Sequence, residues 1–406
     1  MIMKPIDIVV AGHICLDIIP KFGESKVKTL DKILIPGKLV NVFEPAISTG
    51  GSVSNTGLAL FKLGAKIEFM AKVGDDLFGN AIVDIMRQKT GLKVEGMSRV
   101  KGEFTSYTIV IAPPGIDRVF LHSPGTNNTF GYDDINFEVV KKAKIFHLGY
   151  PPLMRKLYLN DGKELIKIYK KVKEVDATTS LDLSLPDPNS ESGKVNWDRI
   201  LKELLPYVDI FLPSIEESCF MVNKSLYQSV KQRAGTNDTV DYFSAKDYTS
   251  LSDIFFEYGA KIVSLKSGHR GLYLRTQNKT VLNKMGYAKP KDINNWSDRE
   301  LWASVYHVEK IASATGSGDS AVAGFLMAFL RGKSIEETIK CANAAGAQNL
   351  RAYDAVSGTG TWDEIQEMIK DKKTRSVEMR IDTPGWWWDK VSKIWMGPRD
   401  KGASKE

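Results

Sequence analysis

A glycine-rich stretch with one acidic residue stands directly before an apolar helical segment, in "ASATGSGDSAVAGF" at 312–325. Gly316 and Gly318 allow a tight turn around Ser317, and the first backbone N–H groups of a helix have no partner within it, so this start can bind an anion. Asp319 lies in the first helical turn, where a carboxylate often serves only as a cap. Beside an anion site, it can instead accept a proton from a hydroxyl that attacks a phosphoryl group.

The same stretch also fits the GxGxxA pattern of dinucleotide-binding proteins, and Glu336 and Glu337 follow at a suggestive distance. That pattern requires a strand after the helix. Here the helix "SAVAGFLMAFLRG" is followed by a second helix, "SIEETIKCANAAGAQNLRA". The missing strand favours the anion site over the dinucleotide site.

The elements that position this turn alternate along the chain. Six short apolar runs predict strands, at 6–12, 66–74, 143–149, 179–185, 208–214 and 260–268. Helix-length amphipathic segments lie between them, at 52–64, 76–90, 160–175, 196–205, 215–223 and 245–258. This alternation predicts an α/β fold with a mainly parallel central sheet, helices on both faces and the site at the carboxyl ends of the strands.

Three regions interrupt the alternation. Strand-like pieces without helices at 13–48 and 101–122 predict a small β-layer that acts as a lid. The polar, poorly periodic stretch from about 276 to 306 predicts an irregular insertion. A tail over 373–406 carries "WWW" at 386–388, which we expect to pack on its own domain; a subunit contact or a stacked ligand are the alternatives.

Composition excludes several classes of protein. The chain has 406 residues, 43% of them hydrophobic and 26% charged, which is typical of a globular protein. Its net charge of +7 is spread over helices that also carry Glu and Asp, so nucleic acid is not expected as a partner. Three widely spaced cysteines, no membrane-length apolar run and no signal-peptide pattern favour the cytoplasm, away from any membrane.

Motifs far apart in the chain together resemble the ribokinase-like, or PfkB, family of carbohydrate and nucleoside kinases. They are "AGHICLDIIP" (11–20), "STGGSVSNTGLALFKLGAKIEFMAKVGDDLFG" (48–79) and "ATGSGD", with "HSPGTNNTF" and "KSGHRG" between them in family order. The resemblance covers about residues 5–360. It implies the ribokinase-like three-layer fold, with a kinase domain over 1–372, the lid described above, and 373–406 as a C-terminal extension.

The resemblance also implies roles for matching residues. Asp319 corresponds to the family's catalytic base, with Gly316, Ser317 and Gly318 as the anion hole. The positions that match sugar-binding residues are Asp17, Gly50, Gly51 and Asn55. The positions that match the ATP-binding strand, turn and neighbouring helix are Lys266, Ser267, Gly268, Gly271 and Asn343. Mg²⁺ is expected with the ATP phosphates.

Two departures from the family pattern concern cations. Ser214 stands in place of an Asn that helps to organise magnesium waters in many members, which leaves Glu217 as the acidic residue of that motif. Ser313 stands where an Asp of a monovalent-cation site is common, with Thr315 two residues on. A K⁺ requirement is therefore left open.

These observations lead to the hypothesis of an ATP-dependent kinase that phosphorylates a hydroxyl of a sugar or sugar derivative. A nucleoside substrate is an alternative, which an aromatic clamp drawn from Phe43, Phe104 and Tyr107 would favour. A catalytically silent, sugar-sensing family member is a second alternative. His13, just before the sugar-binding loop, is assigned no role. Because lid-to-lid dimers occur in the family, a homodimer through the lid is a further expectation.

Overall fold

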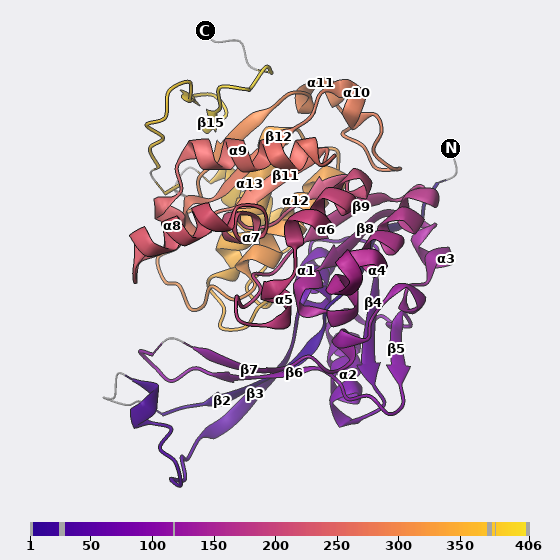
Figure 1. The fold of residues 1–406 in the computed structure, drawn as a ribbon, viewed down its shortest axis with the longest axis vertical. Coiled ribbons are helices and arrows are strands. Elements are labelled where there is room, and N and C mark those ends of the chain that lie inside the picture. The colour runs from indigo at the N-terminus through magenta and orange to yellow at the C-terminus, as the bar shows by residue number, and fades with distance from the viewer. Residues whose placement is uncertain (1–2, 24–28, 117, 372–375, 378, 403–406) are drawn as a thin grey trace.

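The structure is a computed structural model that describes residues 3–23, 29–116, 118–371, 376–377 and 379–402. Part of each predicted lid segment, at 24–28 and 117, lies outside the described residues. Two sheets occur within these ranges, a large one in the main body and a small one that projects from it (Figure 1).

The large sheet has the order β14-β15-β13-β12-β11-β10-β9-β8-β1-β4-β5. Its parallel part confirms the six predicted strands as β1 (Ile6–Gly12), β4 (Ile67–Gly74), β8 (Ala143–Gly149), β9 (Thr178–Asp182), β10 (Ile210–Phe211) and β11 (Ile262–Lys266). It also contains β5 (Met97–Val100), which was not predicted. The antiparallel part consists of β12 (Leu272–Thr276), β13 (Glu300–Ala303), β14 (Trp387–Asp389) and β15 (Ile394–Met396).

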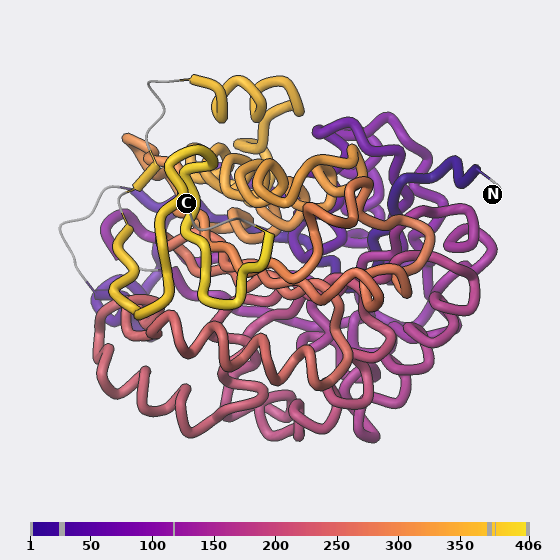
Figure 2. The backbone as a smooth tube through the Cα atoms, turned by 90° about the horizontal axis from the view of Figure 1, so that it is seen from above, coloured from indigo at the N-terminus to yellow at the C-terminus, as the bar shows by residue number. Residues whose placement is uncertain are grey.

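Helices cover both faces of this sheet, which makes three layers and confirms the predicted fold class (Figure 2). Alternation along β1 shows why, because Ile8 and Val10 join one core while Val9 and Ala11 join the other. The first core is completed by α1 (Ser52–Lys62), α2 (Leu77–Thr90), α12 (Ser317–Leu330), α13 (Ile335–Asn349) and α14 (Trp362–Lys370). The second is completed by α3 (Phe137–Val140), α4 (Arg155–Glu174), α6 (Trp197–Leu204), α7 (Ile215–Val222), α8 (Lys224–Ala234) and α9 (Ala245–Glu257).

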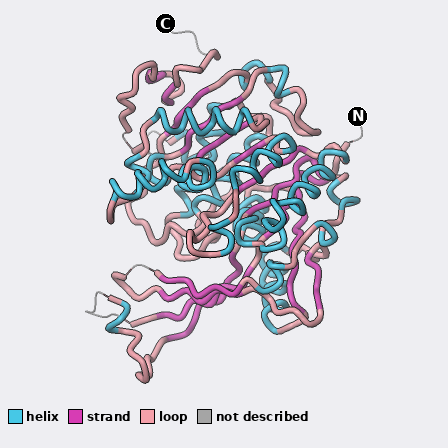
Figure 3. The backbone as a smooth tube through the Cα atoms, in the orientation of Figure 1, coloured by secondary structure: helices cyan, strands magenta, loops and turns pink. Residues whose placement is uncertain are grey.

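The small sheet is the predicted β-lid. Its order is β3-β2-β6-β7, built from β2 (Cys15–Lys21), β3 (Phe43–Gly50), β6 (Tyr107–Ile111) and β7 (Val119–Ser123). Figure 3 shows these four strands side by side and extending away from the helices of the main body. Since β2 follows β1 directly and β3 leads directly into α1, the lid joins the main sheet at the carboxyl end of β1.

The prediction of an irregular insertion over 276–306 is wrong at its end, where Glu300–Ala303 forms β13 between β12 and β15. The sequence did not predict this strand because the charged residue Glu300 interrupts its apolar pattern. The buried Glu300 carboxylate accepts hydrogen bonds from the hydroxyls of Tyr273 and Thr249, both at 2.7 Å. Two short helices, α10 (Lys279–Leu282) and α11 (Ile293–Trp296), also lie in this stretch.

The Trp-rich tail packs on its own chain, as expected. It contributes β14 and β15 to the edge of the large sheet, and Trp386 lies against the rings of Tyr273 and Trp302. A buried ion pair between Arg299 Nε and Asp400 Oδ2, 2.9 Å apart, stabilises the last described turn of the tail. Within the described residues, no helix is long and apolar enough to cross a membrane.

Candidate active site

The glycine-rich turn forms the start of α12, next to the ends of the parallel strands. Gly316 has φ 74° and is the N-cap residue, and a Cβ atom there would overlap the backbone of Ala355, so only glycine fits. The Asn349 side chain donates a 2.9 Å hydrogen bond to the carbonyl of Thr315. The turn that presents the N–H groups of Ser317 and Gly318 is thus held by the surrounding backbone, which suits an anion site.

Asp319 lies in the first turn of α12 and is only 4% exposed. Its carboxylate accepts hydrogen bonds from Asn55 Nδ2 at 3.1 Å, Thr56 Oγ1 at 3.1 Å and the Tyr150 hydroxyl at 2.7 Å. Three donors on one carboxylate fix its orientation. This carboxylate is therefore oriented by groups from α1 and from the end of β8, which is more than a helix cap requires.

Tyr150 was missed by the sequence analysis. It follows the last residue of β8 and adopts φ 66°, a left-handed conformation that is uncommon for a residue other than glycine. Burial, together with the nearby Asp319 carboxylate, raises the pKa of Tyr150, so the phenol stays protonated and donates. The sequence "LGY" at 148–150 could have pointed to Tyr150. It ends a predicted buried strand, and the carboxyl ends of parallel strands meet at the site.

The predicted sugar-binding residues lie together at the junction of the lid and the main body. Asp17, on β2, lies so close to Gly50 that a Cβ atom there would overlap its carboxylate. Gly51 has φ 87°, and a Cβ atom on it would lie 2.5 Å from the His13 ring. Burial raises the pKa of Asp17 to about 6. Asn55, one turn further along, has its amide on Asp319.

The predicted nucleotide-binding turn joins β11 to β12. Ser267 N–H donates to the Gly271 carbonyl at 2.8 Å, so Gly268 lies within a tight hairpin. The Asn343 amide donates to the carbonyls of Ala303 and Ser304, at 2.9 and 3.1 Å, and ties α13 to the end of β13. The structure brings Asn343 to this end of the sheet, and its contact with a nucleotide stays a prediction.

Lys266 points from the end of β11 toward the start of α12. Its ammonium group contacts the buried Asp182 carboxylate and the Leu212 carbonyl, and its aliphatic part lies beside Gly318. Burial alone lowers the pKa of such an amine, but the carboxylates of Asp182 and Glu217 outweigh it and raise the pKa of Lys266. A fixed cation therefore lies close to the turn that is predicted to bind an anion.

Glu217 forms a capping box with Ser214 at the start of α7, with Ser214 N–H donating to its carboxylate at 2.6 Å. Within the described residues, no three His, Cys, Asp or Glu side chains are grouped to hold a metal ion. One oxygen of the buried Asp182 has no hydrogen-bond partner among these residues. Glu217 and Asp182 are two carboxylates near this position. Two carboxylates fit a Mg²⁺ ion that is held mainly by phosphates and water.

The lid contacts the turn that precedes α12. The Arg118 guanidinium, beside β7, donates a hydrogen bond to Ser313 Oγ at 2.9 Å and contacts Thr315 Oγ1. Ser313 is the position at which the chain departs from the family's monovalent-cation pattern, and Thr315 lies two residues on. The lid thus brings a positive charge to the same turn that offers the helix N–H groups.

The three aromatic residues considered for a nucleoside clamp do not pack on one another among the described residues. Phe104 and Phe43 are 72% and 63% exposed, and Tyr107 packs edge-on against Phe78, with ring centroids 5.4 Å apart. Among the described ring contacts, none joins two of these three residues. No observation here favours a nucleoside over a sugar.

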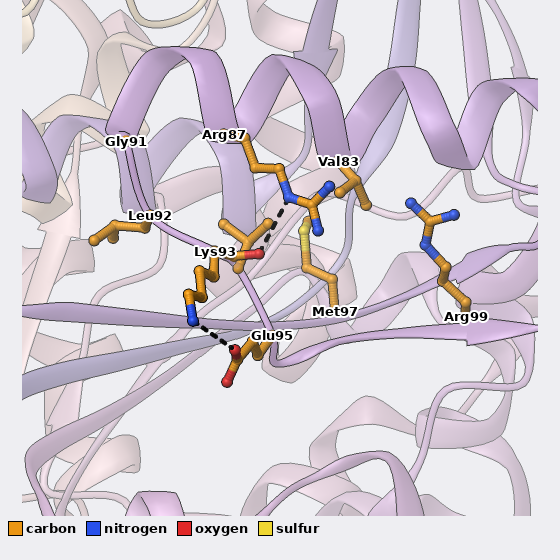
Figure 4. A pocket seen from close by; sticks show the side chains of 9 residues that line it. Val83, Arg87, Gly91, Leu92, Lys93, Glu95, Met97 and Arg99 are labelled. Atoms are coloured by element: carbon orange, nitrogen blue, oxygen red, sulfur yellow. Dashed lines mark hydrogen bonds and ion pairs between the residues drawn. The ribbon is translucent and has the colours of Figure 1, made fainter.

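A separate cavity lies between α2 and β5, away from α12 (Figure 4). Its volume is about 460 Å³, and its lining residues include Arg87, Lys93 and Arg99. Arg87 donates to the Lys93 carbonyl at 3.3 Å, and Lys93 pairs with Glu95. None of the predicted site residues lines this cavity, so it is distinct from the candidate active site.

Comparisons with known proteins show the family and the fold of the chain. Residues 6–361 match a family described as pfkB family carbohydrate kinase. A sugar kinase of Archaeoglobus fulgidus, described as uncharacterized, is 25% identical over 302 residues, which are 74% of this chain and 98% of the relative. A probable fructokinase-4 of Arabidopsis thaliana is 25% identical over 330 residues, covering 79% of this chain and 87% of the relative.

A solved structure of Arabidopsis thaliana ribokinase, complexed with ribose and ATP, has the same fold. It superposes with a TM-score of 0.65 at 20% identity and covers 90% of this chain and 99% of its own.

Proposed function

This chain belongs to the pfkB family of carbohydrate kinases, and on that premise we propose that Asp319 is the base for phosphoryl transfer from ATP to a sugar hydroxyl. Membership makes the chain a phosphotransferase with a hydroxyl acceptor. The observation that carries the residue assignment is the Asp319 carboxylate, buried beside the anion-binding turn and oriented by Asn55, Thr56 and Tyr150.

The acceptor lies between Asp319 and the cradle formed by Asp17, Gly50 and Gly51. Asp17 and the glycine backbone hold hydroxyls that do not react, while the reacting hydroxyl points at Asp319. As this hydroxyl attacks the γ-phosphate, its proton passes to the Asp319 carboxylate. The N–H groups of Ser317 and Gly318 and the start of α12 then stabilise the negative charge on the transferred group.

ATP lies along the hairpin of Lys266, Ser267, Gly268 and Gly271, with Asn343 beside it. The phosphates extend toward the start of α12, where Lys266 stands beside Gly318. Glu217 would orient the waters of a Mg²⁺ ion bound with ATP, and such an ion would neutralise part of the phosphate charge. In the absence of phosphates, Asp182 balances the charge of Lys266.

The lid covers the acceptor and connects to the catalytic turn through Arg118. Closing the site over the acceptor excludes water, which limits hydrolysis of ATP when no sugar is bound. The lid also exposes apolar side chains on its two edge strands, including Phe43, Ile47, Phe120 and Leu121 at 63%, 55%, 50% and 51% exposure. Surfaces of this kind mark interaction sites, and we propose that a second copy of the chain covers them.

The experiment is a screen for ADP release with Mg-ATP across sugars, sugar derivatives and nucleosides, with Asp319→Asn as the control. We expect turnover with at least one sugar and a loss of about 10²–10⁴-fold in the Asn variant, with ATP binding retained in calorimetry. Near-normal turnover of Asp319→Asn would contradict the assignment of Asp319 as the base. Sugar binding by the wild-type protein without any ADP release would show a silent family member instead.

A further inference from the structure

One buried imidazole beside the proposed acceptor position has no hydrogen-bond partner among the described residues. His13 follows β1 and is 2% exposed, and neither of its ring nitrogens has a hydrogen-bond partner among the described residues. Buried polar groups are nearly always paired, and an unpaired one costs free energy. The other buried histidine with an unpaired nitrogen, His147, at least bonds Ser180 through its second nitrogen, 3.0 Å away. The His13 ring is unpaired on both sides.

The His13 ring lies close to Tyr150, to His122 on the lid and to Gly51 of the proposed sugar cradle. On one side, its centroid is 6.1 Å from the ring of Tyr150, whose hydroxyl contacts Asp319. On the other side, it is 5.4 Å from the ring of His122 on the lid. Gly51 leaves room for it, because a Cβ atom there would lie 2.5 Å from Nδ1.

His122 links this ring to Asp17. Its Nδ1 is 3.0 Å from the Thr108 hydroxyl, and Thr108 in turn contacts Cys15 and stabilises the Asp17 carboxylate. The groups along this path come from the main body, the glycine turn and the lid. An acceptor that reaches from Asp319 to Asp17 therefore passes the face of His13.

The charge state of His13 limits what it can recognise. Burial, with a smaller contribution from His122, lowers the pKa of His13 to about 3, so the ring is neutral near pH 7. A neutral imidazole offers one donor and one acceptor, which matches a hydroxyl group. An acceptor that extends from Asp319 to Asp17 would lie between two carboxylates, which repel an anion.

We propose that His13 binds a non-reacting hydroxyl of the acceptor, and that the acceptor is an uncharged polyhydroxylated sugar rather than a sugar acid or a sugar phosphate. This inference rests on the proposed kinase function and specifies its substrate class. The imidazole gains the hydrogen bonds that it lacks in the free protein. His13 acts in binding and takes no part in proton transfer.

The test compares two substitutions of His13 with a matched control elsewhere. His13→Leu removes both ring nitrogens at similar volume, and His13→Asn keeps one donor and one acceptor. Thr338→Val is the control, because Thr338 is also buried with an unpaired side-chain oxygen, on α13. Each protein is assayed for ADP release with fructose, ribose, gluconate and a hexose phosphate, for sugar and ATP binding by calorimetry, and for thermal unfolding.

We expect the wild type to phosphorylate an uncharged sugar and to reject gluconate and the hexose phosphate. His13→Leu should raise the KM for the sugar at least 10-fold, with ATP affinity and unfolding temperature retained. His13→Asn should recover part of the loss, and Thr338→Val should leave the KM unchanged. An unchanged KM in a folded His13→Leu protein, or a preference for an anionic acceptor, overturns this inference and leaves the kinase assignment standing. No turnover with any acceptor overturns both.

Discussion

The hydroxyl of Tyr150 lies 2.7 and 2.8 Å from the two carboxylate oxygens of Asp319. Tyr150 directly follows β8 and Asp319 lies in the first turn of α12, so this contact joins two residues that are 169 positions apart in the chain. Burial and the nearby Asp319 carboxylate raise the pKa of Tyr150, so the phenol stays protonated and donates to the carboxylate. The contact therefore orients the proposed base.

Replacing Tyr150 with Phe should slow turnover. Loss of a donor to a charged group costs about 1.5–3 kcal/mol, and the Asp319 carboxylate then loses a contact that orients it toward the reacting hydroxyl. We expect kcat with the sugar to fall by about 10-fold, with ATP affinity in calorimetry retained. Tyr158→Phe is the control, since the Tyr158 hydroxyl bonds Glu191 instead. An unchanged kcat would show that Tyr150 does not orient the base.

Replacing Asp17 with Asn should stabilise the protein while weakening sugar binding. Burial raises the pKa of Asp17 from 3.8 to about 6, so between these values the folded state binds more protons than the unfolded state. The ionised carboxylate therefore destabilises the fold above pH 6, and this cost is absent below about pH 4. We expect Asp17→Asn to raise the free energy of unfolding by about 1–3 kcal/mol at pH 8, and to change it little at pH 4.

Urea unfolding at both pH values measures this difference, with the exposed Asp84→Asn on α2 as the control. Lower stability of Asp17→Asn at pH 8 would contradict the predicted sign. In the wild type, the KM for the sugar should rise as pH falls through about 6, because the protonated Asp17 loses an acceptor for hydroxyl hydrogens.

The strand order could be predicted where local patterns are strong. Continuous apolar runs such as 6–12 are buried on both faces, and the helices between them carry regular apolar spacing, so alternation alone gave the three layers. The same logic failed at β13. Glu300 interrupts its apolar pattern, and the partners that make the charge tolerable, Tyr273 and Thr249, are more than 25 residues away.

The site could be predicted as a set of residues but not as a set of contacts. Asn55 matched a sugar-binding position, yet its amide bonds Asp319, 264 residues away, which no local pattern specifies. Tyr150 and Arg118 carry no motif of their own, and each becomes visible only when strand ends or lid strands meet the turn before α12. His13 was set aside because a lone histidine is usually satisfied, and its unpaired ring nitrogens appear only in the folded chain.

Replacing Arg118 with Gln should uncouple the lid from the catalytic turn. The guanidinium contacts the hydroxyls of both Ser313 and Thr315, and each hydrogen bond is worth about 0.5–1.5 kcal/mol. Losing both should lower kcat with the sugar by about 10-fold. A less firmly closed lid admits water, so the rate of ATP hydrolysis without sugar should rise relative to sugar phosphorylation.

The ratio of sugar phosphate to ADP measures this coupling. Arg99→Gln is the matched control, because Arg99 lines the separate cavity beside β5. A coupling ratio equal to that of the wild type would mean that the Arg118 contacts do not hold the lid.

Trp386 and Trp388, two of the tryptophans of the tail, should differ in their contributions to stability and to ATP binding. Trp386 is 9% exposed, packs on Trp302 and Tyr273, and so supports the β12–β13 pair behind the nucleotide hairpin. Trp302 Nε1 donates to the Arg270 carbonyl in that hairpin at 2.9 Å. Trp388 is 40% exposed and contacts Trp395 on the outer edge.

Trp386→Ala should therefore lower the free energy of unfolding by about 3–5 kcal/mol, as large aromatic truncations in a core do. It should also weaken ATP binding in calorimetry, because the hairpin loses its packing through Trp302 and Arg270. Trp388→Ala should cost less than about 1 kcal/mol and leave ATP affinity unchanged. Equal effects of the two substitutions would mean that the tail adds stability without supporting the nucleotide-binding turn.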